Sequence, residues 1–327
     1  MLALLRSLIS DFRVSGRESG DGAVNARLAA TTDEIWRDRA GNFVGLIRGA
    51  GINKKKIMLQ THMDGAGFVV TDAEENGDLR FCPSGNFSLR SAAYTEAVTA
   101  RGVRGIITPA GAKGGDPGEL SNDSSAYIFD IGAENRAAAL RRVGSGEFFA
   151  PVPHLTVLGT GKNRLFSGFP IDGRAGAAVL LKCCENLMAD RPQDDIYIVF
   201  AIEGHNNFRL AGTAAASILP DEAMAMGSTD VLKPGDGAVI TVQRKNFVAD
   251  EVLTARLREV AEREKIPYKV GVSGSAPAPG MRIQSEGAGT PTAELDLPLS
   301  RLHTVSETVA ERDMLAAARL AEAFCRG

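Results

Sequence analysis

An apolar strand pattern that ends in two polar residues is the feature that most constrains this chain. Ile57 to Gln60 has the composition of a buried strand, and His62 and Asp64 follow it directly. Ligands and metals bind at the carboxyl ends of strands in open α/β sheets. A carboxylate two residues after a histidine can accept the second ring N–H and fix the tautomer of a metal-binding imidazole. A single His-x-Asp motif equally fits a hydrogen-bonded strand end without metal.

The elements around this strand predict an α/β fold with an insert. Apolar strand patterns alternate with helical ones after residue 155, as in the strand 196–202 and the amphipathic helix 251–264. From about residue 67 to 155, short β-like runs alternate with Gly, Pro, Ser and Asn. We therefore expect a central mixed sheet flanked by helices from residues 1–66 and 156–327. Residues 67–155 are expected to form a small, β-rich, barrel-like inserted domain.

Composition and charge exclude several classes of partner. The chain has a formal net charge of −3 and no long basic run, since residues 54–56 form its densest basic cluster. Neither nucleic acid nor a membrane surface is therefore expected to bind. No apolar stretch is long enough to span a bilayer.

Cysteine usage and the N-terminal pattern favour a cytoplasmic protein. The four cysteines include no C-x-x-C pair, so they predict neither a disulfide framework nor a cysteine zinc site. Their usage fits a reducing compartment. Arg6 interrupts the first apolar run, and the apolar residues around it share one helical face. We expect an amphipathic helix over residues 2–12 rather than a signal sequence.

Histidines and carboxylates gather at the predicted strand ends. His62 follows the first buried strand, Glu203 and His205 follow the strand 196–202, His303 follows a late strand, and Asp172 opens a helix. Because such positions meet at one edge of an α/β sheet, these residues are expected to lie together. Imidazole and carboxylate ligands suit zinc, cobalt or manganese. The cluster predicts metal-assisted hydrolysis with a glutamate as general base, although each histidine taken alone equally fits a structural role.

Short motifs along nearly the whole chain occur in a characteristic order and spacing. They are the stretches at residues 14–18, 38–42, 62–68, 130–133, 172–176, 220–221 and 297–303. In this order they resemble the glutamyl or tetrahedral aminopeptidases, family forty-two of the metallopeptidases, some of which carry older endoglucanase labels.

The resemblance has implications for fold, cofactor and assembly. It implies a catalytic α/β domain of the zinc-peptidase, phosphorylase/hydrolase-like type, and a β-rich insert that builds dimers and often dodecameric shells. It also implies a hydrolase with a divalent metal cofactor, zinc or cobalt, with one or two ions per chain. We therefore expect a peptide or small amide substrate and a homo-oligomer, from a dimer up to a dodecamer.

Four residues of this chain match the family's metal-site positions. By resemblance, His62, Asp172 and His303 are metal ligands, and Asp64 orients His62. The family has a Glu-Glu pair, general base and then ligand, where this chain has Gly204 and His205. We expect His205 to serve as a substitute ligand, because neutral imidazole binds zinc well.

Two family positions carry glycine here. Gly204 stands at the catalytic glutamate, and Gly227 stands at a metal-ligand aspartate. Losing a positioned acid or base typically costs about 10²–10⁴-fold in rate. Glu203 is the nearest replacement base by sequence. Arg174 and Asn206 are predicted as substrate contacts.

Three functions follow from these residues. The first is a metallo-aminopeptidase that hydrolyses N-terminal peptide bonds, with impaired turnover. The second is a catalytically silent homologue, a pseudoenzyme kept as a binding or assembly subunit. The third is a metallohydrolase of another amide that uses His205, since histidine is an effective base near neutral pH. The preserved ligand positions favour activity, and the two glycines oppose it.

Overall fold

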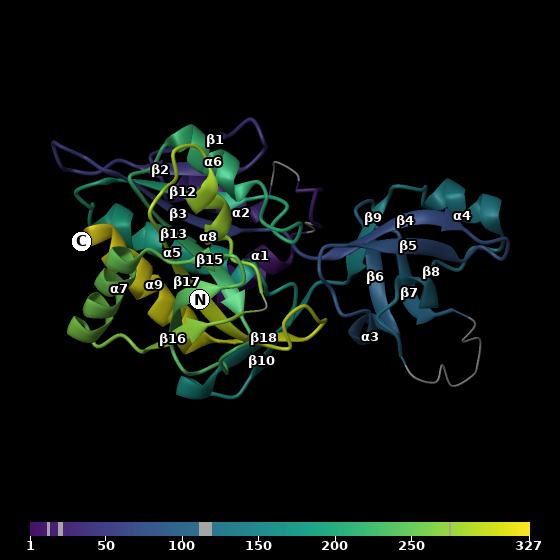
Figure 1. Ribbon diagram of the computed structural model, residues 1–327. Coiled ribbons are helices and arrows are strands. Elements are labelled where there is room, and N and C mark those ends of the chain that lie inside the picture. Colours follow the sequence, from purple (N-terminus) through teal and green to yellow (C-terminus); the bar gives the residue numbers. More distant parts are fainter. Residues whose placement is uncertain (12–13, 19–21, 111–119, 275) are drawn as a thin grey trace.

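The protein forms two lobes, a large α/β lobe and a smaller β-barrel (Figure 1). The structure is a computed structural model that describes residues 1–11, 14–18, 22–110, 120–274 and 276–327. The larger lobe contains a 12-stranded mixed sheet, and the smaller lobe is a closed barrel of six strands. The predicted α/β fold with a barrel-like insert is therefore confirmed.

Four parallel strands form the centre of the large sheet. In spatial order they are β12 (Asp195–Ala201), β3 (Lys56–His62), β13 (Glu222–Thr229) and β17 (Thr292–Ser300). Their side chains are almost all buried on both faces, as expected for apolar runs in a parallel sheet. Because the strands are parallel, their carboxyl ends meet at one edge, and Ala201 lies opposite His62 there.

Further strands extend the sheet on both sides. On one side, β2 (Phe43–Ile47) pairs antiparallel with β12, and β1 (Glu34–Arg37) pairs with β2. Beyond β17 the sheet continues through antiparallel strands β18 (Glu307–Ala310), β11 (Leu165–Phe169) and β10 (His154–Leu158). A branch from β17 adds β14 (Ala238–Arg244), β15 (Phe247–Val248) and β16 (Tyr268–Val272).

Helices cover both faces of this sheet because successive strand residues point to opposite sides. Leu59 packs in the core beneath one helical layer, whereas its neighbour Met58 packs in the core beneath the other. The first layer comprises α1 (Leu2–Ile9), α2 (Ala23–Ala30), α5 (Arg174–Ala189), α7 (Glu251–Arg263) and α9 (Glu311–Arg326), and the second α6 (Ala211–Ile218) and α8 (Gly280–Ser285).

The first helix is shorter than the sequence predicted. It ends at Ile9, and the predicted continuation to residue 12 falls partly outside the described residues. None of the helices in the described part of the chain combines the length and the hydropathy needed to cross a bilayer.

The barrel leaves the large lobe directly after β3 and returns before β10. Its antiparallel strands are β4 (Gly67–Ala73), β5 (Leu79–Ser84), β6 (Thr95–Thr99), β7 (Arg104–Pro109), β8 (Tyr127–Asp130) and β9 (Phe148–Pro151). Phenylalanines fill its interior, and the rings of Phe129 and Phe149 stack with centroids 4.1 Å apart. The short helices α3 (Leu89–Ala92) and α4 (Arg136–Arg142) belong to this lobe, as does the 3₁₀ turn Ser124–Ala126. A further 3₁₀ turn, Gly161–Asn163, connects β10 and β11 of the large lobe.

Candidate metal centre

The predicted ligand residues meet at the carboxyl edge of the parallel strands. His62 ends β3, His205 follows β12, His303 follows β17, and Asp172 precedes α5. All four line one cavity of about 390 Å³. Four segments that are far apart in the sequence therefore contribute to one site, at the place where α/β sheets bind ligands.

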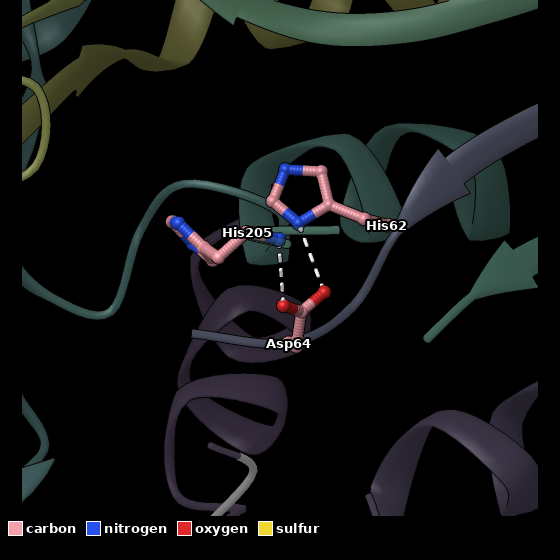
Figure 2. A group of neighbouring side chains, drawn as sticks. All are labelled: His62, Asp64 and His205. Atoms are coloured by element: carbon pink, nitrogen blue, oxygen red, sulfur yellow. Dashed lines mark hydrogen bonds and ion pairs between the residues drawn. The ribbon is translucent and has the colours of Figure 1, made fainter. Parts of the chain in front are cut away.

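His62 and Asp64 form a buried pair (Figure 2). His62 is 2 % exposed, and its Nδ1 lies 3.3 Å from Oδ1 of Asp64. The Asp64 carboxylate also accepts hydrogen bonds from the backbone N–H groups of Gly204 (2.7 Å) and His205 (2.9 Å). Asp64 therefore fixes the His62 ring and the backbone of the His205 segment together, as a carboxylate behind a metal-binding imidazole does.

Asp172 is the residue on which the three imidazoles converge. Its Oδ2 lies 3.7 Å from Nε2 of His205 and 3.5 Å from Nε2 of His303, and its Oδ1 lies 3.5 Å from Nε2 of His62. These distances exceed the 2.7–3.2 Å of an ordinary N–H···O bond. Two ligand atoms bound to one tetrahedral zinc are about 3.4 Å apart, given bond lengths of about 2.0–2.2 Å. The separations therefore suit ligands around a metal ion.

The charges of the site residues also suit a bound cation. Burial lowers the pKa of His62, but the carboxylates of Asp172 and Asp64 outweigh it and raise that pKa to about 10. Burial raises the pKa of Asp172, yet the neighbouring histidines hold it well below its usual range. Oδ1 of Asp172 is buried and has no hydrogen-bond partner among the described residues. Neutral imidazoles around a divalent ion would satisfy the same charge balance, so the residues fit a metal.

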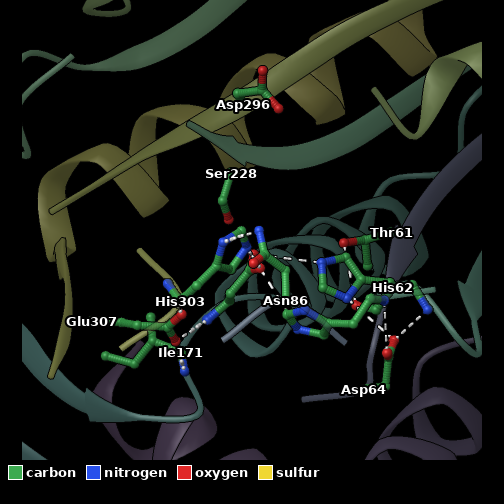
Figure 3. A network of polar contacts seen from close by, with 12 residues as sticks. Thr61, His62, Asp64, Asn86, Ile171, Ser228, Asp296, His303 and Glu307 are labelled. Carbon is green, nitrogen blue, oxygen red and sulfur yellow. Dashed lines mark hydrogen bonds and ion pairs between the residues drawn. The ribbon is translucent and has the colours of Figure 1, made fainter. Parts of the chain in front are cut away.

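Glu307, which the sequence analysis missed, holds two of the ligand segments. Its buried carboxylate accepts hydrogen bonds from the backbone N–H groups of Ile171 (2.8 Å), Asp172 (2.9 Å) and His303 (2.9 Å) (Figure 3). Burial and the charge of Asp172 raise the pKa of Glu307 to about 7, although the three N–H donors oppose that rise. The only sequence signal was an acidic residue four positions after His303.

Glu18 performs a related task at the His205 segment. Its Oε1 accepts the backbone N–H of Glu203 at 2.8 Å, while Asp64 accepts those of the next two residues. Burial, followed by the charge of Asp64, raises the pKa of Glu18 to about 7. Two buried carboxylates therefore hold three successive N–H groups and set the path of the chain into His205.

The structure leaves no space for a side chain at Gly204. A Cβ there would lie 2.7 Å from Nδ1 of His62 and closer still to its Cβ and Cγ. Glu203, predicted as a replacement base, has φ of 54° and points its carboxylate to Arg209, whose Nε donates to it at 2.8 Å. Glu203 does not line the cavity, and its catalytic role stays a prediction.

Other predicted and unpredicted residues differ in their access to the cavity. Arg174 is fully buried and donates to the backbone oxygen of Asp11, whereas Asn206 is exposed. Neither lines the cavity, and their role as substrate contacts stays a prediction. Asn86, from the loop after β5, does line it and places its amide Nδ2 3.1 Å from Nδ1 of His303. If that amide is turned to present its oxygen, it fixes the tautomer whose free Nε2 faces Asp172.

The far wall of the cavity is built around Arg244. Its Nη1 lies 3.1 Å from Oδ2 of Asp296 and 3.2 Å from Oε1 of Glu294, and all three side chains are buried. Asp296 also accepts the hydroxyl of Thr241 at 2.7 Å. In Figure 3, Asp296 lies beyond Ser228 from the histidines. A Cβ at Gly227, the neighbour of Asp296 across the sheet, would lie 2.7 Å from Oδ1 of that aspartate.

Comparisons with known proteins place this geometry in context. The family model described as M42 glutamyl aminopeptidase matches residues 41–320. A putative aminopeptidase of Acetivibrio thermocellus is 30 % identical, over 99 % of this chain and 98 % of that protein. The solved aminopeptidase APDkam598 of Desulfurococcus kamchatkensis is 26 % identical with a TM-score of 0.89, over 99 % and 94 % of the two chains. The TET1 peptidase of Pyrococcus horikoshii shares the fold, with a TM-score of 0.85, 23 % identity and coverage of 99 % and 98 %.

Proposed function

The chain belongs to the M42 glutamyl aminopeptidase family, and from this premise we propose that it hydrolyses N-terminal peptide bonds of small peptides with a divalent metal ion. The supporting observation is the convergence of Asp172, His205 and His303 in one cavity, at separations that suit metal ligands. Two imidazoles, one carboxylate and an open fourth position are typical of catalytic zinc sites. Zinc or cobalt held there would polarise the scissile carbonyl and activate a water molecule.

The cavity suits the amino end of a short peptide. Its volume of about 390 Å³ lies within the range of small-molecule sites. Asp230 is exposed and lines the cavity, so its carboxylate is placed to attract the ammonium group of an N-terminal residue. Asn86 and Asn207 add amide groups that can hydrogen-bond to a peptide backbone, and Phe208 and Leu302 add apolar surface.

A slow or silent homologue is the second candidate, and the surroundings of Gly204 favour it. No carboxylate projects from residue 204, and Glu203 is paired with Arg209 outside the cavity. A metal site without a positioned base is expected to turn over about 10²–10⁴-fold more slowly than one that has it.

Turnover of a substrate panel distinguishes the two candidates. Purified protein would be loaded with zinc or cobalt and assayed on aminoacyl-p-nitroanilides and dipeptides. The proposal expects release of the N-terminal product, loss of turnover in Asp172→Asn, and no change in Asp130→Asn, an exposed aspartate of the barrel. A folded, metal-loaded protein that cleaves no member of the panel would establish the silent homologue instead.

Assembly and location complete the proposal. The TET1 peptidase of Pyrococcus horikoshii is described as assembling into a tetrahedron or a large octahedral shell, and this chain is proposed to form a homo-oligomer as well. The barrel lobe exposes Tyr94 and Ile106, which are apolar groups suited to a subunit contact. Light scattering coupled to size-exclusion chromatography would measure the assembly. Four free cysteines, three of them buried, support a cytoplasmic location.

A further inference from the structure

Resting on the metal dependence proposed above, we propose that the cavity holds one tightly bound divalent cation, on Asp172, His205 and His303. His62 stands beside this ion and does not bind it. The number of ions and the identity of their ligands are independent of which peptide is cleaved.

The three proposed ligands form a complete and rigid donor set. Their ligand atoms lie within 4.8 Å of one another, with Oδ2 of Asp172 facing both imidazoles. Buried carboxylates hold the backbone of each segment, because Glu307 binds the N–H groups of Asp172 and His303 and Asp64 binds that of His205. Ligands held in this way lose little freedom when an ion binds, which favours high affinity.

His62 belongs to a different group of ligand atoms, together with Asp64 and His205. In that group Asp64 is already engaged by Nδ1 of His62 and by two backbone N–H groups. A second ion at Nε2 of His62 would therefore depend on Oδ1 of Asp172, 3.5 Å away, as its other protein ligand. Two protein donors are fewer than the three that catalytic zinc sites use.

A third donor to such an ion would have to come from the far wall of the cavity, where Arg244 already engages the carboxylates. Gly227 has no side chain, and Asp296 across the sheet is bound by Arg244 and Thr241. Asp230 lines the cavity, but it belongs to neither group of candidate ligand atoms among the described residues. No further carboxylate in the described part of the chain therefore completes a site at His62.

Arg244 is a charged residue of this wall and pairs with two buried carboxylates, Glu294 and Asp296. A guanidinium stays protonated at every physiological pH. Arg244 lines the cavity; burial lowers its pKa, but the charges of Asp296 and Glu294, and after them that of Asp172, outweigh burial and raise that pKa. Because Arg244 holds Asp296 in this ion pair, the Asp296 carboxylate is already engaged and does not supply a donor to a second ion between His62 and Asp172.

Metal stoichiometry after dialysis tests this inference without an activity assay. The apoprotein would be titrated with Zn²⁺ by calorimetry and with Co²⁺ by visible absorption, and the retained metal would be counted by elemental analysis. Wild type is expected to bind one equivalent. Removal of a residue that only supports a metal ligand typically lowers metal affinity by about 10–100-fold. His205→Ala and His303→Ala remove ligands themselves and should lower the affinity for Zn²⁺ by more than this. His62→Ala should retain one equivalent with less than about 10-fold loss, and so should the exposed control His154→Ala.

Each alternative result is decisive. Two tightly bound equivalents in wild type, falling to one in His62→Ala, would overturn the inference, as would loss of all metal in His62→Ala. Because removal of a buried ring can unfold a protein, His62→Asn is the second variant, and circular dichroism confirms folding. One retained equivalent without peptidase turnover would refute the proposed function and leave this inference standing. Two bound equivalents together with peptidase turnover would refute this inference and support the proposed function.

Discussion

Replacing Gly204 by alanine adds a single methyl group at the most crowded point of the site and so tests the geometry described here. The new Cβ would lie 2.7 Å from Nδ1 of His62 and nearer to its Cβ and Cγ, all below the 3.0 Å that real Cβ atoms respect. His62 cannot withdraw easily, because it ends a buried central strand and its ring is held by Asp64. The Gly204 segment must therefore move, which breaks its hydrogen bonds to Asp64.

The expected cost is that of overpacking plus a displaced ligand. Overpacking a tight site typically costs about 1–3 kcal/mol, so the free energy of unfolding should fall by that amount. Because His205 shifts with its neighbour, the affinity for Zn²⁺ should also fall by about 10–100-fold. Gly204→Glu, which supplies the carboxylate that the family resemblance predicts at this position, should lower metal affinity at least as much and should not raise turnover.

Urea unfolding and calorimetric zinc titration measure both effects. Gly144→Ala is the matched control, because nothing lies within 4 Å of a Cβ at Gly144, and its stability should stay within about 0.5 kcal/mol of wild type. The steric reasoning is refuted if Gly204→Ala matches wild type in stability and zinc affinity. It is also refuted if Gly204→Glu gains peptidase activity.

Three further outcomes are expected. Glu307→Gln, which weakens the acceptor for the backbone of Asp172 and His303, should lower zinc affinity by about 10–100-fold in calorimetry; unchanged affinity would exclude a positioning role. Zinc at 100 times its dissociation constant for wild type should raise the free energy of unfolding of wild type by about 2.7 kcal/mol, measured by urea unfolding. The same zinc concentration should raise that of His303→Ala far less, and an equal rise in both would contradict the ligand assignment. The hydrogen bonds from Arg191 lower the pKa of Asp33 from 3.8 to about 2, so its contribution, on the order of 1 kcal/mol, is complete above pH 4 and is lost as the pH falls toward 2. Asp33→Asn should therefore be less stable than wild type at pH 7, with a gap that narrows below pH 4; a constant gap would contradict this.

The sequence predicted the residues that lie at strand ends because their positions follow from local pattern alone. Apolar runs such as 57–60 and 196–202 identify parallel strands, and parallel strands place His62 and His205 at the same edge. The strands β10, β11 and β18 were not predicted. They are half-exposed or short, so their apolar content did not mark them.

Residues that act through long-range contacts could not be predicted in the same way. Glu307 and Glu18 matter because their carboxylates reach backbone N–H groups 135 and 185 residues away in the sequence. Asn86 reaches His303 because the loop after β5 meets the His303 loop, where the backbone N–H of Ser88 also donates to the backbone oxygen of His303. The crowding at Gly204 and the closure of the cavity wall by Arg244 likewise depend on packing between separate strands, which no local pattern encodes.

Anomalous diffraction from zinc-loaded crystals, collected on both sides of the zinc absorption edge, tests the central claim most directly. The account predicts one strong peak per chain, about 2.0–2.2 Å from Oδ2 of Asp172 and from Nε2 of His205 and His303. A cavity with no anomalous peak after loading, or a peak coordinated by other residues, would contradict it.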